Sequence, residues 1–241
     1  MSEGYAVYLG KPCVDAYYEV SEWPEEGGKF LGSFVCNVPG GMVANAACVL
    51  AGYDYPVYLF AAMGDDEDAR FLMEDLESYG VDVSMTRLIP GRKDTKCFIF
   101  RSGAERTILV AEGDKDVLPL TEEEKDFLLG AEYIYTIIPD IKSYEGMAEL
   151  LEEHRRRGGK LVMDCETTGY TEDWREYLQL AHLVFMNTTA LEKYAEGQST
   201  CELEEELMGL GTGILVETLG SKGSRVVTAE ASFPPGCTMS R

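Results

Sequence analysis

The stretch YIYTIIPDIKSYEGMAELLEEHRRRGGKLVM, residues 133–163, decides the fold class. It opens on an apolar run at 133–138 and closes on a second at 161–163, and both runs predict short buried strands. Between them, four apolar residues recur at helical spacing and predict an amphipathic helix. These four are Tyr144, Met147, Ala148 and Leu151. A strand, a helix and a strand in this order are typical of a parallel sheet.

The same alternation of apolar runs and helical patterns continues through most of the chain. Helical patterns are again followed by apolar runs, so the sequence predicts an α/β fold with a mostly parallel central sheet covered by helices. Thr121 stands before three glutamates and predicts a helix N-cap. The further candidate strands are 5–9, 57–62, 183–186 and 214–216. The further helical faces are Met42, Ala46, Val49 and Tyr53, and Leu72, Leu76 and Tyr79.

Two segments break this alternation, because they are rich in strand-forming residues but no helix follows them. They are residues 13–36 and 93–111, and the second contains two strand-like runs around Ser102-Gly103-Ala104-Glu105, which indicates a hairpin. Since isolated two-stranded pieces are unstable, we expect the two segments to form one small sheet. The domain prediction is therefore a main α/β domain of residues 1–12, 37–92 and 112–241, and a small sheet of residues 13–36 and 93–111.

Composition narrows the possible partners. The 241 residues carry a formal net charge of −22, which argues against nucleic acid or an anionic membrane as a partner. The chain has neither an apolar run long enough to span a membrane nor a basic and apolar leader, so we expect a cytoplasmic protein. Its seven cysteines form no CxxC pair, so zinc spacing is absent and free thiols are expected.

Several common catalytic motifs are absent. No Gly-Lys pair is followed by Ser or Thr, so there is no Walker A loop, and neither HExxH nor GxSxG occurs. The two histidines, His154 and His182, give poor support for a catalytic triad.

The segment VPGGMVANAA, residues 38–47, runs from a glycine turn into a helix. Glycines at positions 40 and 41 let a ligand approach the backbone, and a helix N-terminus offers unpaired N–H groups. Asn45, in the first turns of that helix, has a donor and an acceptor suited to a sugar hydroxyl. Alone, the same pattern also fits a simple tight turn before a helix.

Four further motifs accompany it in order. They are Gly10-x-x-x-x-Asp15, the stretch 62–66 with Leu76-x-x-x-Gly80-Val81-Asp82, Gly103-x-Glu105-Arg106-Thr107, and Val216-Glu217-Thr218-Leu219-Gly220-Ser221-Lys222-Gly223. The ordered set covers roughly residues 1–228, and it resembles the ribokinase-like (PfkB) carbohydrate kinase family.

This resemblance implies a fold, an activity and partners. The fold is a Rossmann-like three-layer sandwich with a mostly parallel central sheet and a small β-sheet lid, which often serves as a homodimer interface. The activity is transfer of the ATP γ-phosphoryl group to a hydroxyl of a sugar-like small molecule, with Mg²⁺.

The resemblance also implies roles for single residues. It assigns Asp15, Gly40, Gly41 and Asn45 to the sugar hydroxyls. It places Thr218, Gly220 and Gly223 at the border of the ATP site, and Asn187 near the phosphates and Mg²⁺, while the metal ligands stay unassigned.

Purely structural roles remain open for several of these residues. Asp15 could close a turn after the first strand, and Thr218 and Gly220 could form a strand-end turn. Asp164 lies where open α/β sheets bind ligands, but it could equally cap the next segment.

The chain departs from the family pattern in three places. Ala190 stands where many members have the Glu of N-x-x-E, and Ala69 replaces a usual glycine. The D-T-x-G-A-G-D stretch, which supplies the family's anion hole and catalytic Asp, occurs nowhere in the 241 residues. No catalytic residue is therefore assigned, and the 241-residue chain is expected to be inactive. Three explanations stay open: a shortened or frameshifted sugar kinase, a non-catalytic sugar- or nucleotide-binding relative, or a structural subunit completed by a partner.

Overall fold

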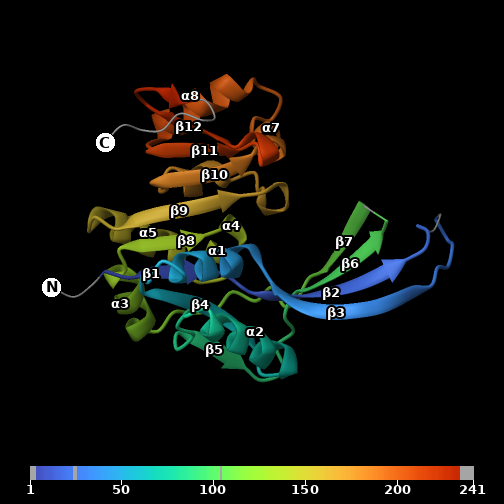
Figure 1. The fold of residues 1–241 in the computed structure, drawn as a ribbon. Helices are drawn as coiled ribbons and strands as arrows, with labels where there is room; N and C mark the ends of the chain where they lie inside the picture. The colour runs from blue at the N-terminus through green and yellow to red at the C-terminus, as the bar shows by residue number, and fades with distance from the viewer. Residues whose placement is uncertain (1–3, 24–25, 104, 234–241) are drawn as a thin grey trace. The chain divides into compact units, whose positions relative to one another are not determined.

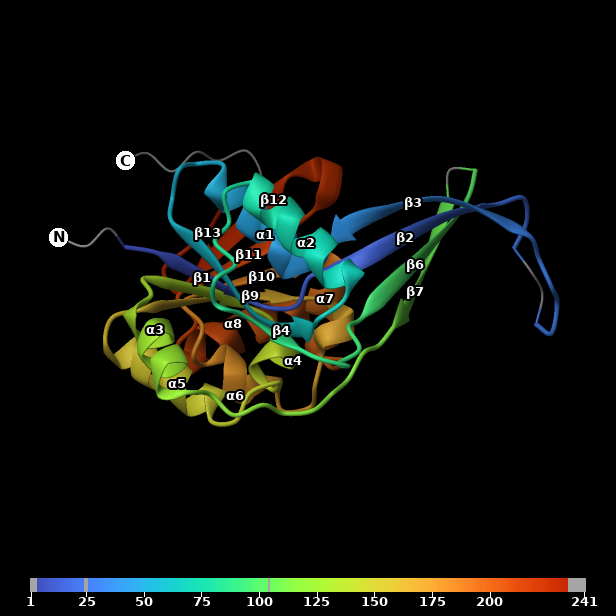
Figure 2. The same cartoon turned by 90° about the horizontal axis from the view of Figure 1, so that it is seen from below.

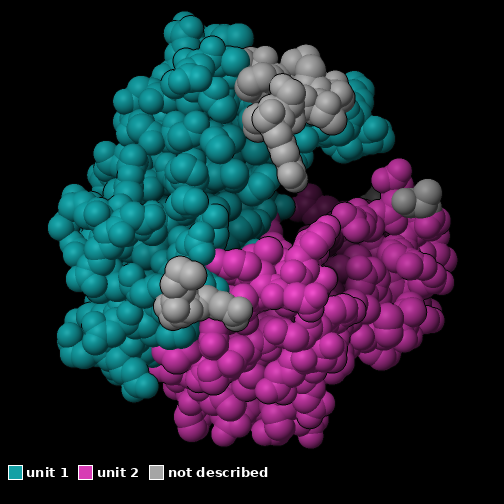
Figure 3. All heavy atoms as spheres, turned by 60° about the vertical axis from the view of Figure 1, so that its left-hand side comes forward, with its two compact units in different colours: residues 1–9, 117–241 teal, residues 10–116 magenta. Residues whose placement is uncertain are grey.

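The computed structural model describes residues 4–23, 26–103 and 105–233 (Figure 1). The chain divides into two compact units, residues 1–9 with 117–241 and residues 10–116, which are coloured separately in Figure 3. Within the described residues, none of the helices combines the length and the apolar character that a membrane crossing needs.

The first unit is built on a mostly parallel sheet, as the sequence predicts. Its strands follow the order β13-β12-β11-β10-β9-β8-β1. The five strands from β11 to β1 run parallel, whereas β12 is antiparallel to β11 and β13 to β12. The bounds are β1 Ala6–Leu9, β8 Tyr133–Thr136, β9 Lys160–Cys165, β10 Leu183–Asn187, β11 Ile214–Thr218, β12 Ser224–Thr228 and β13 Ser232–Phe233.

Helices line one side of this sheet (Figure 2). The bounds are α3 Glu122–Gly130, α4 Ile138–Ile141, α5 Met147–Arg156, α6 Trp174–Leu178, α7 Thr188–Tyr194 and α8 Thr200–Leu210. The predicted N-cap at Thr121 is confirmed, because its side chain accepts a hydrogen bond from the Glu124 backbone and forms a capping box. The predicted strand 133–138 was too long: Pro139 lies in the first turn of α4, where its fixed φ favours a helix start.

Burial alternates along the central strands of this sheet. In β9, Leu161 and Met163 are buried, while Val162 and Asp164 between them are half-buried. The strands β8, β10 and β11 repeat this alternation. One face of the sheet is thus fully covered, and Asp164 lies on the other face, close to the carboxyl end of its strand.

The second unit contains a four-stranded sheet of order β3-β2-β6-β7. The strands β2 and β6 run parallel, and the outer strands β3 and β7 are antiparallel to them. The unit also holds the parallel pair β4 and β5 and two helices. The bounds are β2 Cys13–Val20, β3 Gly32–Gly40, β4 Val57–Gly64, β5 Thr86–Ile89, β6 Lys96–Ser102, β7 Glu105–Ala111, α1 Met42–Ala51 and α2 Glu67–Ser78.

The helix predicted after Gly41 forms, but it buries a different face. The sequence predicts a stripe that includes Val49 and Tyr53, and these side chains are 65% and 80% exposed. The buried residues of α1 are Val43, Ala44 and Ala47. The prediction of this face was wrong because the helix packs closely through small residues, and packing of this kind does not follow residue hydrophobicity alone. The face predicted for α2 is confirmed at Leu72 and Leu76, whereas Tyr79 is exposed.

Candidate functional sites

Asp15 and Gly40 meet across neighbouring strands in the second unit. Asp15 is half-buried on β2, and Gly40 ends β3 in register with Cys13. A Cβ at position 40 would lie only 2.5 Å from Oδ2 of Asp15. The carboxylate therefore packs directly on a backbone that only glycine leaves open.

Gly41 joins β3 to α1. It has φ 104° and is the N-cap of the helix, and a Cβ there would lie 2.9 Å from the Cα of Pro12. Both its left-handed backbone and its close approach to Pro12 require glycine. The predicted glycine turn into a helix is thus present.

Asn45 lies in the first turn of α1, where its N–H donates to the carbonyl of Gly41 at 2.9 Å. Its side chain is exposed, and it lines a small cavity of about 10 Å³ together with Gly40, Cys48 and Asp75. The structure thus brings the four residues assigned to the sugar into one region of the second unit.

Two thiols lie beside Asp15 and were not among the predicted site residues. The Sγ atoms of Cys13 and Cys97 are 3.8 Å apart, and Sγ of Cys13 is 3.6 Å from Oδ1 of Asp15. Burial raises the pKa of both thiols, and the neighbouring Asp15 carboxylate raises each of them further. The two cysteines are 84 positions apart, so no local spacing could have revealed them.

The predicted nucleotide-binding residues of the first unit gather at the carboxyl ends of β10 and β11. Asn187 and Thr218 are register partners on these strands. The Asn187 side chain caps α7 by accepting a hydrogen bond from the Ala190 N–H at 2.8 Å, and Thr218 is exposed. Ala190 is fully buried, so this position lies in the core.

The loop after Thr218 is a tight glycine turn. Gly220 and Gly223 have φ of 57° and 91°, and the Leu219 N–H donates to the Gly223 carbonyl at 2.8 Å. A Cβ on Gly220 would meet no atom within 4 Å. The N–H groups of Lys222 and Gly223 donate within the turn, so a neighbouring anion would meet those of Gly220 and Ser221, as in the concave backbone sites that bind phosphate.

A buried charge network stabilises the same end of the sheet. Arg225 on β12 donates to Oε2 of Glu217 at 3.0 Å and also forms an ion pair with Glu204 of α8. The second oxygen of Glu217 accepts a hydrogen bond from the Thr188 hydroxyl at 3.1 Å. Glu204 belongs to a run of three glutamates, yet it is only 8% exposed. Its partner lies 21 positions away, so only the fold pairs them.

Asp164 accepts a hydrogen bond from the Tyr135 hydroxyl at 2.7 Å. Burial raises the pKa of the Asp164 carboxyl, and the hydrogen bond from Tyr135 opposes that effect. The register pairs Asp164 with Phe185, two residues before Asn187. Asp164 therefore belongs to the same strand edge as the predicted nucleotide residues.

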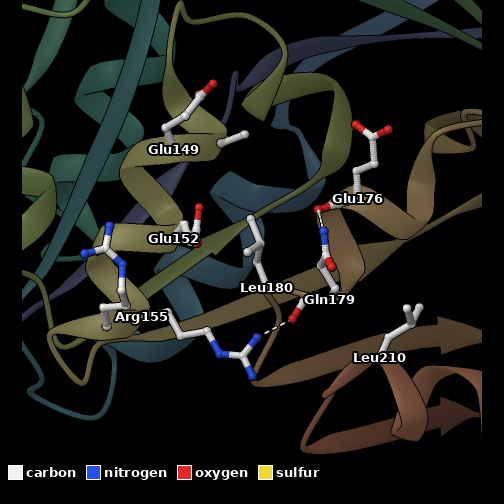
Figure 4. Close-up of a pocket in the computed structure, with 9 residues that line it drawn as sticks. Glu149, Glu152, Arg155, Glu176, Gln179, Leu180 and Leu210 are labelled. Carbon is white, nitrogen blue, oxygen red and sulfur yellow. Dashed lines mark hydrogen bonds between the residues drawn. The ribbon is translucent and has the colours of Figure 1, made fainter.

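A broad groove of about 730 Å³ lies elsewhere on the first unit, lined by residues of α5, α6 and α8 (Figure 4). Arg155 spans it and donates to the carbonyls of Gln179 and Gly211. This arginine thus satisfies carbonyls beyond the ends of two helices, a structural role. None of the predicted site residues lines the groove.

Comparisons with known proteins agree with the motifs. The model of the pfkB family carbohydrate kinases matches residues 5–238. An ATP-dependent ribose-1-phosphate kinase of Halopiger xanaduensis is 25% identical over 199 residues, which cover 80% of this chain and 64% of that protein. This chain thus spans a little less than two thirds of the length of that curated relative.

Two solved structures resemble the chain closely in fold. Ribokinase of Arabidopsis thaliana complexed with ribose and ATP has a TM-score of 0.81 at 18% identity, and the match covers 96% of this chain and 77% of that one. Ribokinase of Giardia lamblia has a TM-score of 0.82 at 18% identity, over 100% and 77% of the two chains. The predicted ribokinase-like α/β fold, with a mostly parallel sheet and a second small sheet, is confirmed.

Proposed function

Because the chain belongs to the pfkB family of carbohydrate kinases, we propose that it serves ATP-dependent phosphoryl transfer to a hydroxyl of a sugar or sugar-like substrate. The observation that carries the proposal is the Asp15 carboxylate held against Gly40 at the start of α1. A carboxylate accepts hydrogen bonds from two hydroxyls, and the glycine at position 40 leaves the space that this carboxylate occupies. Ribose and its 1-phosphate are the first substrates to test, since relatives act on or bind them.

The residues at the carboxyl ends of β10 and β11 fit a nucleotide. Thr218 is exposed, and the turn that follows it offers the backbone N–H groups of Gly220 and Ser221 to phosphate. ATP would supply the transferred group, and this turn would position its phosphates. Phosphoryl transfer depends mainly on positioning and charge stabilisation, which such a turn can provide.

Few side-chain oxygens at this end of the sheet are available to bind Mg²⁺. The Ala190 side chain offers no oxygen, and both carboxylate oxygens of Glu217 are engaged by Thr188 and Arg225. Asp164 is the carboxylate at this edge that fits as a ligand of an ion already bound to phosphates, because Mg²⁺ is commonly held by one or two carboxylates together with substrate phosphates.

The 241-residue polypeptide, used alone, is proposed to bind sugar but not to transfer phosphate. None of its residues forms the D-T-x-G-A-G-D stretch that supplies the family's catalytic Asp. A positioned base contributes roughly 10²–10⁴ in rate. Losing one preorganised donor to developing charge costs roughly 10²–10³ more.

Binding is tested by thermal unfolding with a panel of pentoses, hexoses, their phosphates and nucleosides. A matching sugar should raise the melting temperature of the wild-type chain, because it binds only the folded state. Asp15→Asn should abolish the shift, whereas Asp126→Asn, which removes an exposed charge on α3, should retain it. No response to any member of the panel, or an equal response from Asp15→Asn, would contradict the proposal.

Transfer is tested separately by ADP release from ATP with each sugar that binds. The expected result is no ADP release above background. Turnover that disappears in Asn45→Ala would overturn the proposal that the chain does not transfer phosphate. The alternative of a non-catalytic relative is favoured by the buried Ala190 in place of the family's Glu. That alternative predicts nucleotide binding without ADP release in the longest natural form of the protein.

We also propose that the small sheet mediates a homodimer. One face carries Tyr18, Phe98 and Phe100 beside Phe34, and the Phe34 side chain is 56% exposed. Exposed aromatic clusters of this kind are typical of interfaces. Sedimentation equilibrium should show a dimer that Phe34→Glu dissociates; a wild-type chain that is monomeric at every concentration would exclude it.

A further inference from the structure

We propose that Cys13, Asp15 and Cys97 form a binding site for a thiophilic divalent cation such as Zn²⁺, with a fourth coordination position left open. Their ligand atoms, two sulfurs and one carboxylate oxygen, all lie within 4.8 Å of one another. Thiolates and carboxylates are common ligands of Zn²⁺, and a zinc ion with three protein ligands keeps its fourth position for water or another small ligand.

The distances match a tetrahedral ion. With Zn–S of about 2.3 Å, two sulfurs on a tetrahedron are about 3.8 Å apart, and a sulfur and an oxygen about 3.5 Å. The two sulfurs are 3.8 Å apart, and Sγ of Cys13 is 3.6 Å from Oδ1 of Asp15. A metal could therefore enter without a large movement of these atoms.

The fold presents the three side chains on one face. Cys13 and Asp15 are two residues apart on β2, so they point to the same side of the sheet. Asp15 is in register with Cys97 on the parallel neighbour β6. The adjacent Lys96 forms an ion pair with Asp68 of α2 at 2.7 Å, which fixes the start of β6. The ligands are thus positioned by strand pairing rather than by a flexible loop.

The ligand charges favour a divalent cation. Each cysteine would exchange its S–H bond for an S–metal bond and release one proton to solvent, because the thiolate is the ligand. Two thiolates and the Asp15 carboxylate then carry three negative charges, and a bound divalent ion reduces the net charge of the site to −1, where Cys13 is largely buried. No oxidant is needed. A disulfide between the same thiols would instead require one, and the sulfurs would have to approach to about 2.05 Å.

The site has a consequence for regulation that rests on the proposed function. The carboxylate of Asp15 cannot hold a metal and accept the same sugar hydroxyls, so Zn²⁺ would compete with sugar. The cation site itself depends only on the three side chains, and it can be tested without any sugar.

The first test is titration of the full chain with Co²⁺ under a non-coordinating reductant. We expect thiolate-to-cobalt charge-transfer absorption and the visible bands of tetrahedral Co²⁺, saturating at one ion per chain. Cys97→Ser and Cys13→Ser should lose these bands. Asp15→Asn should weaken binding by more than roughly tenfold, since even an outer-shell partner contributes that much.

The matched control is Cys36→Ser, which removes an exposed thiol from β3 of the same sheet. This variant should titrate like the wild type. Identical bands in the wild type, Cys13→Ser and Cys97→Ser would overturn the proposal, as would the absence of bands in the fully reduced wild type.

A second measurement does not depend on the variants folding. X-ray absorption of the chain loaded with one equivalent of Zn²⁺ should show two sulfurs and two lighter neighbours in the first shell, and four sulfurs or none would contradict the site. Thermal unfolding with sugar is then repeated in the presence of Zn²⁺, which should suppress the sugar-dependent shift in melting temperature. If metal binds but no sugar raises the melting temperature of the wild type, the cation site is supported and the proposed function fails.

Discussion

The carboxylate of Asp15 lies so close to the Cα of Gly40 that a methyl group there would be 2.5 Å from Oδ2. The two residues come from strands β2 and β3, and the antiparallel pairing of these strands brings them together. Gly40 is therefore needed for space, in contrast to Gly41, which is also needed for its positive φ of 104°.

Gly40→Ala should displace the Asp15 carboxylate and abolish sugar-dependent stabilisation. Overpacking of this kind costs about 1–3 kcal/mol of unfolding free energy. Urea unfolding measures the loss of unfolding free energy. Thermal unfolding measures the sugar response, with the sugar that raises the melting temperature of the wild type. Gly209→Ala is the control, since a Cβ there meets no atom within 4 Å. In the last turn of α8 this change should stabilise the chain by at most about 0.5–1 kcal/mol. A sugar response retained in Gly40→Ala would contradict the assignment of Asp15.

Arg225→Leu should destabilise the chain strongly, because it leaves Glu204 and Glu217 buried without their shared cation. Removing one partner of a buried ion pair typically costs about 3–5 kcal/mol, and we expect the lower end because the arginine side chain is 24% exposed. Urea unfolding at neutral pH gives the value. Arg70→Leu breaks a surface pair with Asp65 and should change stability by less than about 0.5 kcal/mol. Equal effects of the two changes would contradict a buried network.

His154 makes stability depend on pH below neutrality. Its ring is fully buried, with Nε2 2.8 Å from the Ala131 carbonyl, and burial lowers its pKa below the ordinary 6.5. The unfolded chain therefore takes up a proton near pH 6.5, while the folded chain does so only at lower pH. This contribution to stability is complete above pH 6.5 and is lost as the pH falls through that value towards the folded pKa.

The comparison is urea unfolding at pH 7.5 and at pH 5.5 for the wild type and for His154→Gln. The variant should lose less stability between these two pH values than the wild type. His182→Gln, which replaces the exposed second histidine, serves as the control. An unchanged pH dependence in His154→Gln would show that other groups account for it.

Thr121→Ala should weaken α3 by removing one half of its capping box. The hydroxyl accepts a hydrogen bond from the Glu124 N–H at 3.2 Å, and loss of such a cap costs about 1 kcal/mol. Thermal and urea unfolding should both detect it. Thr121→Ser keeps the oxygen and should stay within a few tenths of a kcal/mol of the wild type. If the serine and alanine variants unfolded alike, the cap would contribute nothing.

Local patterns account for the elements that the sequence predicts correctly. Hydrophobic period, caps and glycine turns act over a few residues, so the order of strands and helices and the Thr121 cap can be read directly. The ordered motifs predicted the family and the fold, and both are confirmed.

Local patterns do not predict which face of a helix is buried. Val49 of α1 and Tyr53, just after the helix, are exposed, while Ala44 and Ala47 of α1 are buried. Helical spacing defines several stripes, and the shape of the surface that the helix meets selects one of them. Local spacing does not predict the burial of Glu204 either, because its partner Arg225 lies 21 positions away.

The sequence by itself therefore determined the α/β alternation, the family and the residues proposed to bind sugar and nucleotide, because each of these rests on short-range patterns. The tertiary structure alone decided which side chains share a site. The register of β2 with β6 places Cys97 beside Asp15, and the pairing of β2 with β3 places Cys13 opposite Gly40. Strand register is set by long-range packing, because a shift of one residue would turn every side chain to the opposite face.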